Sequence, residues 1–261
     1  MESRMSLQAS ASGDGRALIG RSCVRTSRVL TFCASMLTLV LMSCGVNRRA
    51  VSLAPADVIP AETVEIARAR QALLVVSERA PRERFATAWL LRRESGEAWS
   101  VVRGPLRASV GARGVAPAGL KREGDRRTPS GVFTLTEALG REPNPDSGLP
   151  YRLATDDDAW DERPDSPTYN QWVRGKAAHG ITGRLADDPL LRLCVVVDYN
   201  RFPVVPGMGS AIFVHEADPD GAGTFGCIGF RRDELEWLIS TLDPRRAPVI
   251  VIRRLEDISA H

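Results

Sequence analysis

From about residue 68 to the C-terminus, the apolar residues of the chain come in short runs and mostly not at the spacing of an amphipathic helix. The runs are ALLVVS, ATAWLLRRE, AWSVVRG, GVFTLTEAL, RLCVVVDYN, SAIFVH, CIGF and PVIVIRRL. Such runs, bounded by Gly, Pro, Asn, Asp or Ser, are typical of β-strands. A Ser-Gly-Glu turn between the second and third runs predicts a β-hairpin. The sequence therefore predicts a mostly β (α+β) domain.

One segment, RDELEWLISTLDP, carries a convincing helical period. Leu235, Leu238, Ile239 and Leu242 stand at i, i+3, i+4 and i+7, so they share one helix face. Acidic residues in the first turn and Pro244 after the last apolar residue are typical helix boundaries. One main helix is therefore expected, directly after the CIGF run.

The length and composition predict one principal domain with an N-terminal appendage. The chain has 261 residues, of which 43% are hydrophobic, and this is enough for one sizeable core. The predicted parts are an N-terminal extension with a signal peptide, a lipid-anchored flexible tether, the folded domain and a short tail. Their boundaries are 1–43, 44–67, 68–255 and 256–261. Residues 141–190 have too little periodicity for a strand or helix assignment.

The N-terminus indicates export. Arg25 and Arg28 precede VLTFCASMLTLVLMSC, an apolar run of about fourteen residues, which is typical of a signal peptide and too short for a membrane span. The sequence LMSC at 41–44 resembles the lipobox of bacterial lipoproteins and predicts a lipid anchor at Cys44. Because Met is unusual at the middle position of a lipobox, an ordinary cleaved signal peptide is the alternative. Both interpretations place the protein in the cell envelope, and the lipoprotein interpretation places it on the outer face of the cytoplasmic membrane.

The composition argues against two classes of function. The net charge is only +3, and the basic residues, almost all Arg, are scattered and do not form a stripe, so no nucleic-acid partner is expected. Besides His215, the histidines are His179 and His261, and Cys194 lies within a predicted buried strand. No pair of ligands has zinc-like spacing, so no metal is expected.

Export also decides which cysteines remain in the folded domain. Cys23 and Cys33 leave with the signal peptide and Cys44 is assigned to the lipid, which leaves Cys194 and Cys227. Cys194 lies in LRLCVVVDY, where a free cysteine behaves as a small hydrophobic residue. Cys227 lies in a Gly-Cys loop context instead. A disulfide between the two remains open at this point.

The segment GSAIFVHEADPDGAGTFGCIGF carries the candidate chemistry. If the strand that ends in His215 lies beside CIGF, the imidazole can take the proton of the Cys227 thiol and produce a nucleophilic thiolate. Gly226 allows backbone conformations in which the N–H groups near it and Cys227 converge as an oxyanion hole. Thr224 can hydrogen-bond locally and hold the loop. A structural histidine beside a common Gly-Cys dipeptide is the other interpretation, and spacing alone does not choose between them.

These residues also resemble a known family. IFVHEADPDGAGTFGCIGF is similar to the active-site segment of the L,D-transpeptidase catalytic domain (YkuD-like), whose motif is a His, a loop, and then Ser or Thr, a variable residue, Gly and Cys. VGARGVAPAGLKREGDRRTPSGVFTL resembles the glycine-rich entry of the family. SPTYNQWV and VVVDYNRFPVVPGMGSAIFVH resemble an exported, lipoprotein-like branch. The resemblance covers about residues 100–253, with four segments in order.

The resemblance implies a YkuD-like β-sandwich or barrel with one main helix after the catalytic cysteine. It also implies Cys227 as the nucleophile, His215 as its base, the Gly226–Cys227 backbone as the oxyanion site and Thr224 as the hydroxyl of the motif, with no cofactor. The implied substrate is a peptidoglycan stem peptide. Cys227 would attack the amide bond that joins an L-configured centre of the stem peptide to a D-amino acid. This attack would release the D-amino acid and leave the stem peptide attached to Cys227 as a thioester. An amine acceptor then gives transpeptidation, and water gives hydrolysis.

The chain departs from the family pattern around the nucleophile. Phe225 replaces the usual His, Gly229 stands near a usual Asn or Arg, Glu216 replaces the usual Gly, and the His-to-Cys loop is shorter. These changes concern the donor and acceptor pockets more than the thiol. Phe225 and Arg231 are therefore candidate substrate-binding residues.

The neighbouring charged residues have competing interpretations. A guanidinium can receive a substrate carboxylate in bidentate fashion, which is the functional interpretation of Arg231 and Arg232. Solvated charges at a helix entry are the structural alternative for both arginines, and the favoured one. Lys121, Arg122 and Arg126 lie in a segment whose Gly-Asp and Thr-Pro-Ser-Gly sequences are first of all turn formers, so a structural role is favoured there over a pocket lining.

Three functions remain open at this stage. The first is a cysteine L,D-transpeptidase-like enzyme, and the second is an L,D-carboxypeptidase or endopeptidase that uses water in place of an amine. The third is a non-catalytic lipoprotein that binds cell-envelope material.

Overall fold

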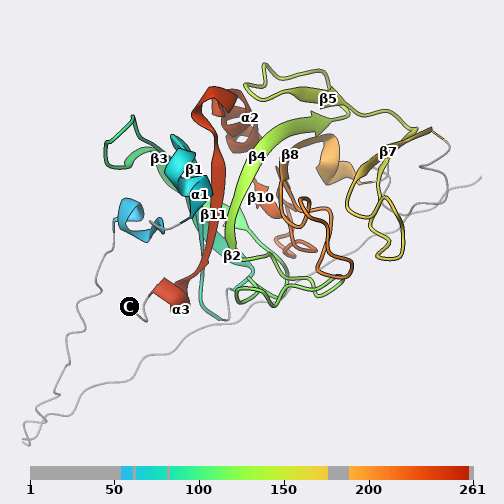
Figure 1. The fold of residues 1–261 in the computed structure, drawn as a ribbon, viewed down its shortest axis with the longest axis horizontal. Coiled ribbons are helices and arrows are strands. Elements are labelled where there is room, and N and C mark those ends of the chain that lie inside the picture. The colour runs from blue at the N-terminus through green and yellow to red at the C-terminus, as the bar shows by residue number, and fades with distance from the viewer. Residues whose placement is uncertain (1–53, 61–62, 81–82, 176–187, 259–261) are drawn as a thin grey trace, which may run out of the picture. The chain divides into compact units, whose positions relative to one another are not determined.

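The computed structural model describes residues 54–60, 63–80, 83–175 and 188–258 (Figure 1). The predicted signal peptide, the lipobox and Cys44 lie outside the described residues, as do His179 and His261. None of the described helices combines the length and hydrophobicity that crossing a lipid bilayer requires.

The described elements are mainly strands. The helices are η1 (Pro55–Val58), α1 (Val64–Arg68), η3 (Pro189–Arg192), α2 (Arg232–Thr241), η4 (Pro244–Arg246) and α3 (Leu255–Ile258). The strands are β1 (Gln71–Ser77), β2 (Phe85–Arg92), β3 (Ser100–Ser109), β4 (Gly131–Gly140), β5 (Tyr151–Leu153), β6 (Asp158–Trp160), β7 (Trp172–Arg174), β8 (Leu193–Val197), β9 (Phe213–Glu216), β10 (Ile228–Phe230) and β11 (Val249–Arg254). The predicted mostly β fold and its main helix after Cys227 are confirmed.

The main sheet closes on itself. Within the described residues its nine strands follow the order β11-β1-β2-β3-β10-β9-β8-β4-β5. β11 also pairs with β4, so the eight strands from β11 to β4 form a closed ring. Figure 1 shows β4 and β11 side by side at this closure. Closure removes the free sheet edges of those eight strands and gives a barrel. The predicted hairpin is confirmed, since β2 and β3 pair antiparallel across the turn.

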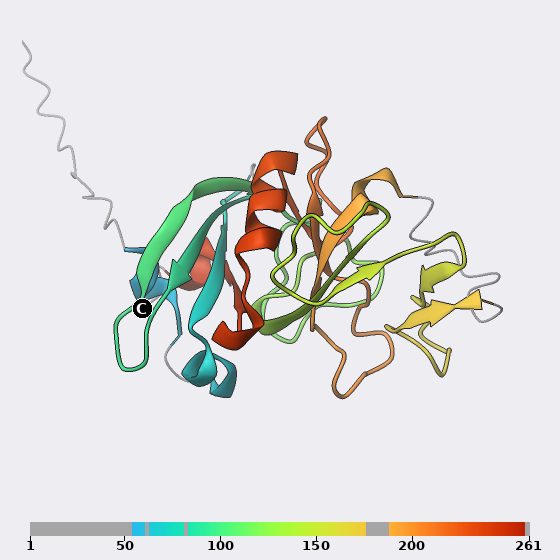
Figure 2. The same cartoon turned by 90° about the horizontal axis from the view of Figure 1, so that it is seen from above.

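The region without periodicity adds structure outside this ring. β5 pairs with β4 beyond the closure, and β6 and β7 form a separate two-stranded sheet. Figure 2 shows β6 and β7, in yellow, on the far side of α2 from strands β1 to β3. Strands of three residues are too short to leave a period-two pattern, which explains why the sequence did not predict them.

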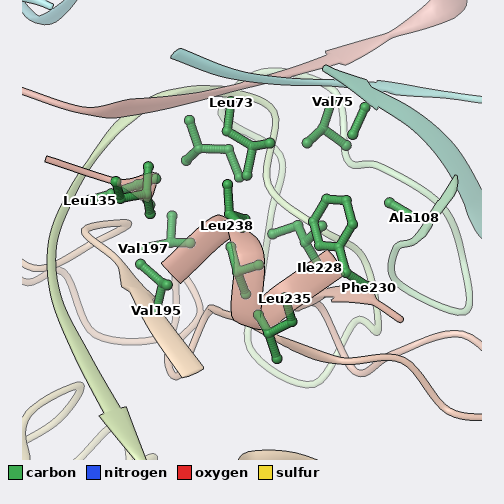
Figure 3. Packing of buried hydrophobic residues seen from close by; sticks show 14 of the residues in the cluster. Leu73, Val75, Ala108, Leu135, Val195, Val197, Ile228, Phe230, Leu235 and Leu238 are labelled. Atoms are coloured by element: carbon green, nitrogen blue, oxygen red, sulfur yellow. The ribbon is translucent and has the colours of Figure 1, made fainter. Parts of the chain in front are cut away.

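A single large cluster, here called the barrel core, fills one face of the closed sheet. It collects buried side chains from the strands of the ring and from α2, including Leu73, Leu135, Val195, Ile228 and Leu238. Figure 3 shows these side chains gathered around α2. The predicted apolar helix stripe is therefore the part of α2 that packs against the sheet.

The opposite face of the sheet is called the outer face. Along β8, Leu193, Val195 and Val197 join the barrel core, while Cys194 and Val196 belong to a smaller cluster on the outer face. That cluster, here called the outer cluster, contains Leu139, Ala154, Trp160, Cys194, Val196 and Phe213, with Cys227 packed against it. β8 is buried on both faces, as its continuous apolar run predicts.

The packed part of the chain begins before the predicted boundary at residue 68. Val58, Ile59 and Ile66, from the segment predicted as a tether, are buried against the outer face of β1 and β11. Thr63 caps α1 by accepting a hydrogen bond from the Ile66 N–H at 3.2 Å. At the other end, α3 begins at Leu255 and extends into the predicted tail. Helices of four or five residues are too short to show an amphipathic period in sequence.

Substitution Leu238→Ala tests the packing of α2. Because the side chain is fully buried in the barrel core, we expect the free energy of unfolding to fall by about 2–5 kcal/mol. Urea unfolding followed by circular dichroism measures this change. The exposed Ser240→Ala on the same helix is the matched control, with a change within about 0.5 kcal/mol. Equal unfolding midpoints for the two variants would contradict the assigned packing.

Candidate active site

His215 and Cys227 lie on neighbouring strands. His215 is the third residue of β9, and Cys227 directly precedes β10. The two strands run parallel, with Ile228 opposite Val214 and Gly229 opposite His215. Because residues two apart on a strand share a face, the side chains of His215 and Cys227 both lie on the outer face. Cys227 lies two residues before the position opposite His215, on the neighbouring strand. The Cα atoms of the two residues are therefore about 8 Å apart.

The Cys227 thiol makes two hydrogen bonds with the backbone at the start of β9. It donates to the Ala211 carbonyl at 3.2 Å and accepts from the Phe213 N–H at 3.4 Å. Within the described residues no hydrogen bond joins Cys227 to His215. The structure thus brings the two side chains to one face, while the thiol hydrogen lies on the Ala211 carbonyl and not on the imidazole.

Burial keeps the thiol of Cys227 protonated. Burial disfavours the thiolate and raises the pKa of Cys227 to about 12, with the charges of Glu162 and Asp188 acting in the same direction. The Phe213 N–H and the positive charge of Lys121 lower the same pKa. At neutral pH the described state therefore holds a neutral thiol, where the sequence analysis expects a thiolate beside the imidazole.

His215 is held in one tautomer. Its Nδ1 lies 2.6 Å from the Glu216 carbonyl oxygen, so Nδ1 carries the proton and donates it. Nε2 then keeps its lone pair. His215 is only 5% exposed, and this burial lowers its pKa. The ring is therefore neutral near pH 7. A neutral ring with a basic Nε2 is the form that can accept a thiol proton.

Two threonines fix the turn into Cys227. Thr224 Oγ1 donates to the Cys227 carbonyl at 2.7 Å and accepts from the Gly226 N–H at 3.1 Å. Thr128 Oγ1 donates to the same carbonyl at 3.2 Å and accepts from the Gly111 N–H at 2.8 Å. Thr224 thus holds the loop in the way the sequence suggested. The Gly226 N–H, which was a candidate oxyanion donor, is already bonded to Thr224, and this leaves the Cys227 N–H as the remaining candidate.

Gly226 is needed for its backbone. Its φ is 142°, a conformation that residues with a side chain rarely adopt. A Cβ at this position would lie 3.0 Å from the Arg127 carbonyl oxygen and 3.1 Å from Ile212 Cδ1. The glycine therefore allows the chain to turn into the nucleophile position.

Lys121 lies behind the same turn. Its residue is 4% exposed, and its Nζ donates to Asp125 Oδ1 and to the Arg122 carbonyl, each at 2.7 Å. A Cβ added to Gly226 would lie 3.7 Å from the Cε of Lys121. A Cβ added to Gly209 would lie 3.3 Å from its Nζ. Two glycines make room for this buried ammonium. A structural role in a turn was favoured for this segment from sequence. A signal that could have pointed to Lys121 is that it is one of only two lysines in an Arg-rich chain.

A network around the half-buried carboxylate of Glu123 anchors the segment that precedes β9. Glu123 Oε2 accepts from the Tyr169 hydroxyl at 2.5 Å and from Ser210 Oγ at 2.7 Å. The Gly209 N–H donates to the Tyr169 oxygen at 3.2 Å. Burial raises the pKa of Tyr169, and its hydrogen bond to Glu123 acts in the same direction, so this hydroxyl stays protonated. The network fixes residues 209 and 210, which lead into the backbone that holds the thiol.

Asn170 anchors the next residue. Its Oδ1 accepts from the Ala211 N–H at 3.0 Å and from Trp160 Nε1 at 2.9 Å. Its Nδ2 donates to the carbonyls of Tyr199 and Asn200 at 3.0 and 2.8 Å. Asn170 therefore holds the N–H side of Ala211, the residue whose carbonyl accepts the hydrogen bond from the Cys227 thiol. Asn170 lies within the SPTYNQWV segment, but its role could not be predicted from sequence because its partners are distant in the chain.

The candidate substrate-binding residues are exposed beside the site. Phe225 is 79% exposed, with the Arg126 guanidinium 4.9 Å from its ring centroid. Arg231 is exposed, and its Nε donates to Asp233 at 3.2 Å. Both side chains can meet a ligand without breaking the fold, so their substrate-binding role stays a prediction.

Arg232 has a structural position. It contacts Glu142, Glu216 and Glu236, with N···O distances of 3.4 Å to Glu216 and 2.6 Å to Glu236. These ion pairs connect the first turn of α2 to β9 and to the segment after β4. Arg232 is thus largely engaged within the protein, in contrast to Arg231.

Cys194 and Cys227 are both free thiols. Cys194 lies on β8, and β9 separates that strand from Cys227, so their Cα atoms are about 10 Å or more apart. A disulfide needs Cα atoms within about 7 Å. In the part of the chain that the structure describes, no group of three His, Cys, Asp or Glu side chains is placed to hold a metal ion.

The family model described as YkuD, the L,D-transpeptidase catalytic domain, matches residues 83–251. The matched range covers more than half of the 261 residues and includes His215 and Cys227. No curated protein matches the chain.

Substitution Lys121→Met tests the charge behind the nucleophile. Because the ammonium lowers the thiol pKa, we expect its loss to raise that pKa and to slow iodoacetamide alkylation of Cys227 severalfold at pH 8. In the unmodified protein the alkylation rate should rise with pH from 7 to 10 without a plateau, because the thiol pKa is about 12. Mass spectrometry of the labelled peptide measures both effects.

Lys121→Arg is the matched control, because it keeps the charge and should retain most of the alkylation rate. Circular dichroism of both variants checks the fold. A rate in Lys121→Met equal to that of the unmodified protein would show that the ammonium has no influence on the thiol.

Proposed function

Because the chain belongs to the L,D-transpeptidase catalytic domain family, whose members act on peptidoglycan, we propose that it is a cysteine acyltransferase of peptidoglycan stem peptides. The observation that carries the proposal is the pairing of β9 with β10. It puts Cys227 and a neutral His215, with Nε2 unprotonated, on the same face of the sheet. A thiol and a base in this relation support covalent catalysis.

The first step needs a small movement of the thiol. Cys227 Sγ leaves the Ala211 carbonyl and its proton passes to His215 Nε2 as the sulfur attacks the carbonyl carbon of the L-centre to D-residue amide. The Cys227 N–H is the proposed donor to the oxygen that becomes negative. His215 then returns the proton to the leaving amine. The C–N bond breaks, the D-amino acid leaves, and a thioester remains on Cys227.

The second step decides the reaction type. If an amine attacks the thioester, its proton passes through His215 to the sulfur, and a new amide forms. If water attacks, the product is a free carboxylate, and the protein is an L,D-carboxypeptidase or endopeptidase. We propose transfer as the main reaction, because the chain belongs to the L,D-transpeptidase catalytic domain family.

One observation favours a non-catalytic role as the second candidate. The thiol is half-buried, donates to the Ala211 carbonyl, and has a pKa raised to about 12, and such a thiol is unreactive at neutral pH. In that case the domain binds envelope material without turning it over, and no covalent intermediate forms.

Acylation of Cys227 separates these candidates. We expect the full chain to form a covalent adduct with a carbapenem, detected by intact-protein mass spectrometry, and Cys227→Ala to form none. Cys194→Ala is the matched control, because Cys194 is the other free thiol of the described residues, and it should keep the adduct. An adduct that persists in Cys227→Ala would remove this residue as the nucleophile, and no adduct in the unmodified protein would favour the binding role.

The same protein then tests transfer against hydrolysis. Muropeptides with a tetrapeptide stem are incubated with and without a free D-amino acid, and the products are followed by mass spectrometry. We expect the D-amino acid to be exchanged into the stem. Products that carry only a shortened stem in both reactions would assign a hydrolase.

We also propose that the protein is an exported lipoprotein, attached to the outer face of the cytoplasmic membrane through Cys44. The support is the LMSC sequence after the apolar run. In cells that express Cys44→Ala, the protein should move from the detergent phase to the aqueous phase. Cys33→Ala, within the predicted signal peptide, is the control and should stay in the detergent phase. Detergent partitioning that persists in Cys44→Ala would rule out this anchor.

A further inference from the structure

The segment that leads into β9 contains a strained backbone position. Ala211 has a φ of 52°, in the left-handed region that a residue with a side chain rarely adopts. Such a conformation costs free energy and persists only where the surrounding structure imposes it, which happens most often at functional sites. Ala211 is also the residue whose carbonyl oxygen accepts the hydrogen bond from the Cys227 thiol. The strained position and the proposed nucleophile are therefore in direct contact.

Hydrogen bonds on both sides of Ala211 hold the chain in this conformation. On the N-terminal side, the buried Asn170 accepts the Ala211 N–H through Oδ1 at 3.0 Å. On the C-terminal side, the Ile212 carbonyl accepts the N–H of Val197, the last residue of β8, at 3.0 Å. Because the chain is held before and after it, the Ala211 carbonyl keeps its direction toward the thiol.

The two hydrogen bonds of the Cys227 thiol have opposite effects on its ionisation. The bond to the Ala211 carbonyl uses the thiol proton, so it stabilises the neutral thiol and opposes ionisation. The bond from the Phe213 N–H ends on the sulfur, so it can persist in the thiolate and stabilise it. Loss of the first bond alone would therefore leave a sulfur that ionises more easily.

The charged groups that act on the thiol belong to other elements. Glu162, after β6, and Asp188, at the N-terminal cap of η3, disfavour the thiolate, whereas Lys121 favours it. His215, on β9, lies on the same face of the sheet and is neutral near pH 7. A change of backbone conformation at residue 211 leaves all of these groups in the protein, so its effect on the thiol can be measured separately from theirs.

We propose that Ala211 is a positioning residue for the nucleophile. Its left-handed backbone aims its carbonyl at the Cys227 thiol and keeps the thiol proton away from His215 in the resting protein. This role rests on the proposed function, which makes Cys227 the nucleophile. Acylation begins when the S–H···O bond to Ala211 breaks and the thiol proton passes to His215 Nε2. The electron pair of the S–H bond stays on the sulfur, which still accepts the Phe213 N–H.

Infrared spectroscopy of the thiol tests this role without substrate. A hydrogen bond donated by a thiol lowers the frequency of its S–H stretch. The difference spectrum between the unmodified full chain and Cys227→Ala, both in detergent, isolates the band of Cys227, which we expect below that of an alkanethiol in a hydrocarbon solvent. In Ala211→Val the band should move to higher frequency, because a β-branched residue disfavours the left-handed region and the carbonyl turns away.

The alkylation rate of Cys227 is the second readout. At pH 8, iodoacetamide should label Cys227 in Ala211→Val about two- to tenfold faster than in the unmodified protein, as for loss of one hydrogen bond that favours the neutral thiol. Cys194 is the internal control, because it lies in the same outer cluster and a loosened fold would expose it as well. Its labelling, measured by mass spectrometry of the same digest, should stay unchanged.

Ala211→Gly and Ala211→Asn are the matched controls. Gly and Asn both accept the left-handed region, and Asn adds a side chain of about the size of Val. Both variants should keep the band position and the alkylation rate of the unmodified protein. A folded Ala211→Val that keeps them too would overturn the inference. A Cys227 band of the unmodified protein at the alkanethiol frequency would overturn it even if Ala211→Val fails to fold.

Failure of this role is distinguishable from failure of the proposed function, because neither readout needs turnover. A displaced band and faster alkylation in Ala211→Val, in a protein that yields no carbapenem adduct, would support the role of Ala211 at the thiol and reject the catalysis. A carbapenem adduct on Cys227, together with an unchanged band and rate in Ala211→Val, would support the catalysis and reject the role of Ala211.

Discussion

The parallel pairing of β9 with β10 is the constraint on which the site depends. Parallel neighbours cannot be joined by a tight hairpin, so the chain between Glu216 and Ile228 must cross back before it can pair again. Thr224 and Gly226 make this return possible, one through its hydroxyl bonds and the other through its backbone conformation. The closed sheet and the barrel core beneath it then hold the register that places His215 and Cys227 on one face.

The site is held by polar groups that are buried or half-buried. Glu123 and Asn170 bond groups on segments distant in sequence and fix the entry to β9. Lys121 bonds its near neighbours Arg122 and Asp125 and lies behind the turn into Cys227. The same burial raises the pKa of the Cys227 thiol and lowers that of His215, so both groups are neutral at rest. In the proposed mechanism, charge appears only when substrate is present, and the fixed dipoles and the Lys121 charge then act with little screening by water.

The sequence was sufficient for most strands of the closed sheet and for the main helix, and it singled out the candidate site residues. Period-two and continuous apolar runs predict β1, β2, β4, β8 and β11, because burial of a strand face is recorded in local alternation. The spacing in α2 predicts its buried stripe for the same reason. His215, Thr224, Gly226 and Cys227 were identified from a motif, since one loop contains all four and their chemistry is evident from their residue types.

Other features were decided by the tertiary structure alone. Val58, Ile59 and Ile66 pack onto a sheet whose strands are far away in the chain, so a tether was predicted where η1 and α1 are found. The role of Asn170 likewise depends on partners that are distant in the chain, and Lys121 reaches the Cys227 turn only because the fold brings that turn beside it. The direction of the Cys227 thiol, toward the Ala211 carbonyl, depends on a rotamer and on backbone placement. Sequence determines what a local segment prefers to bury, whereas the contacts between distant segments exist only once the sheet has closed.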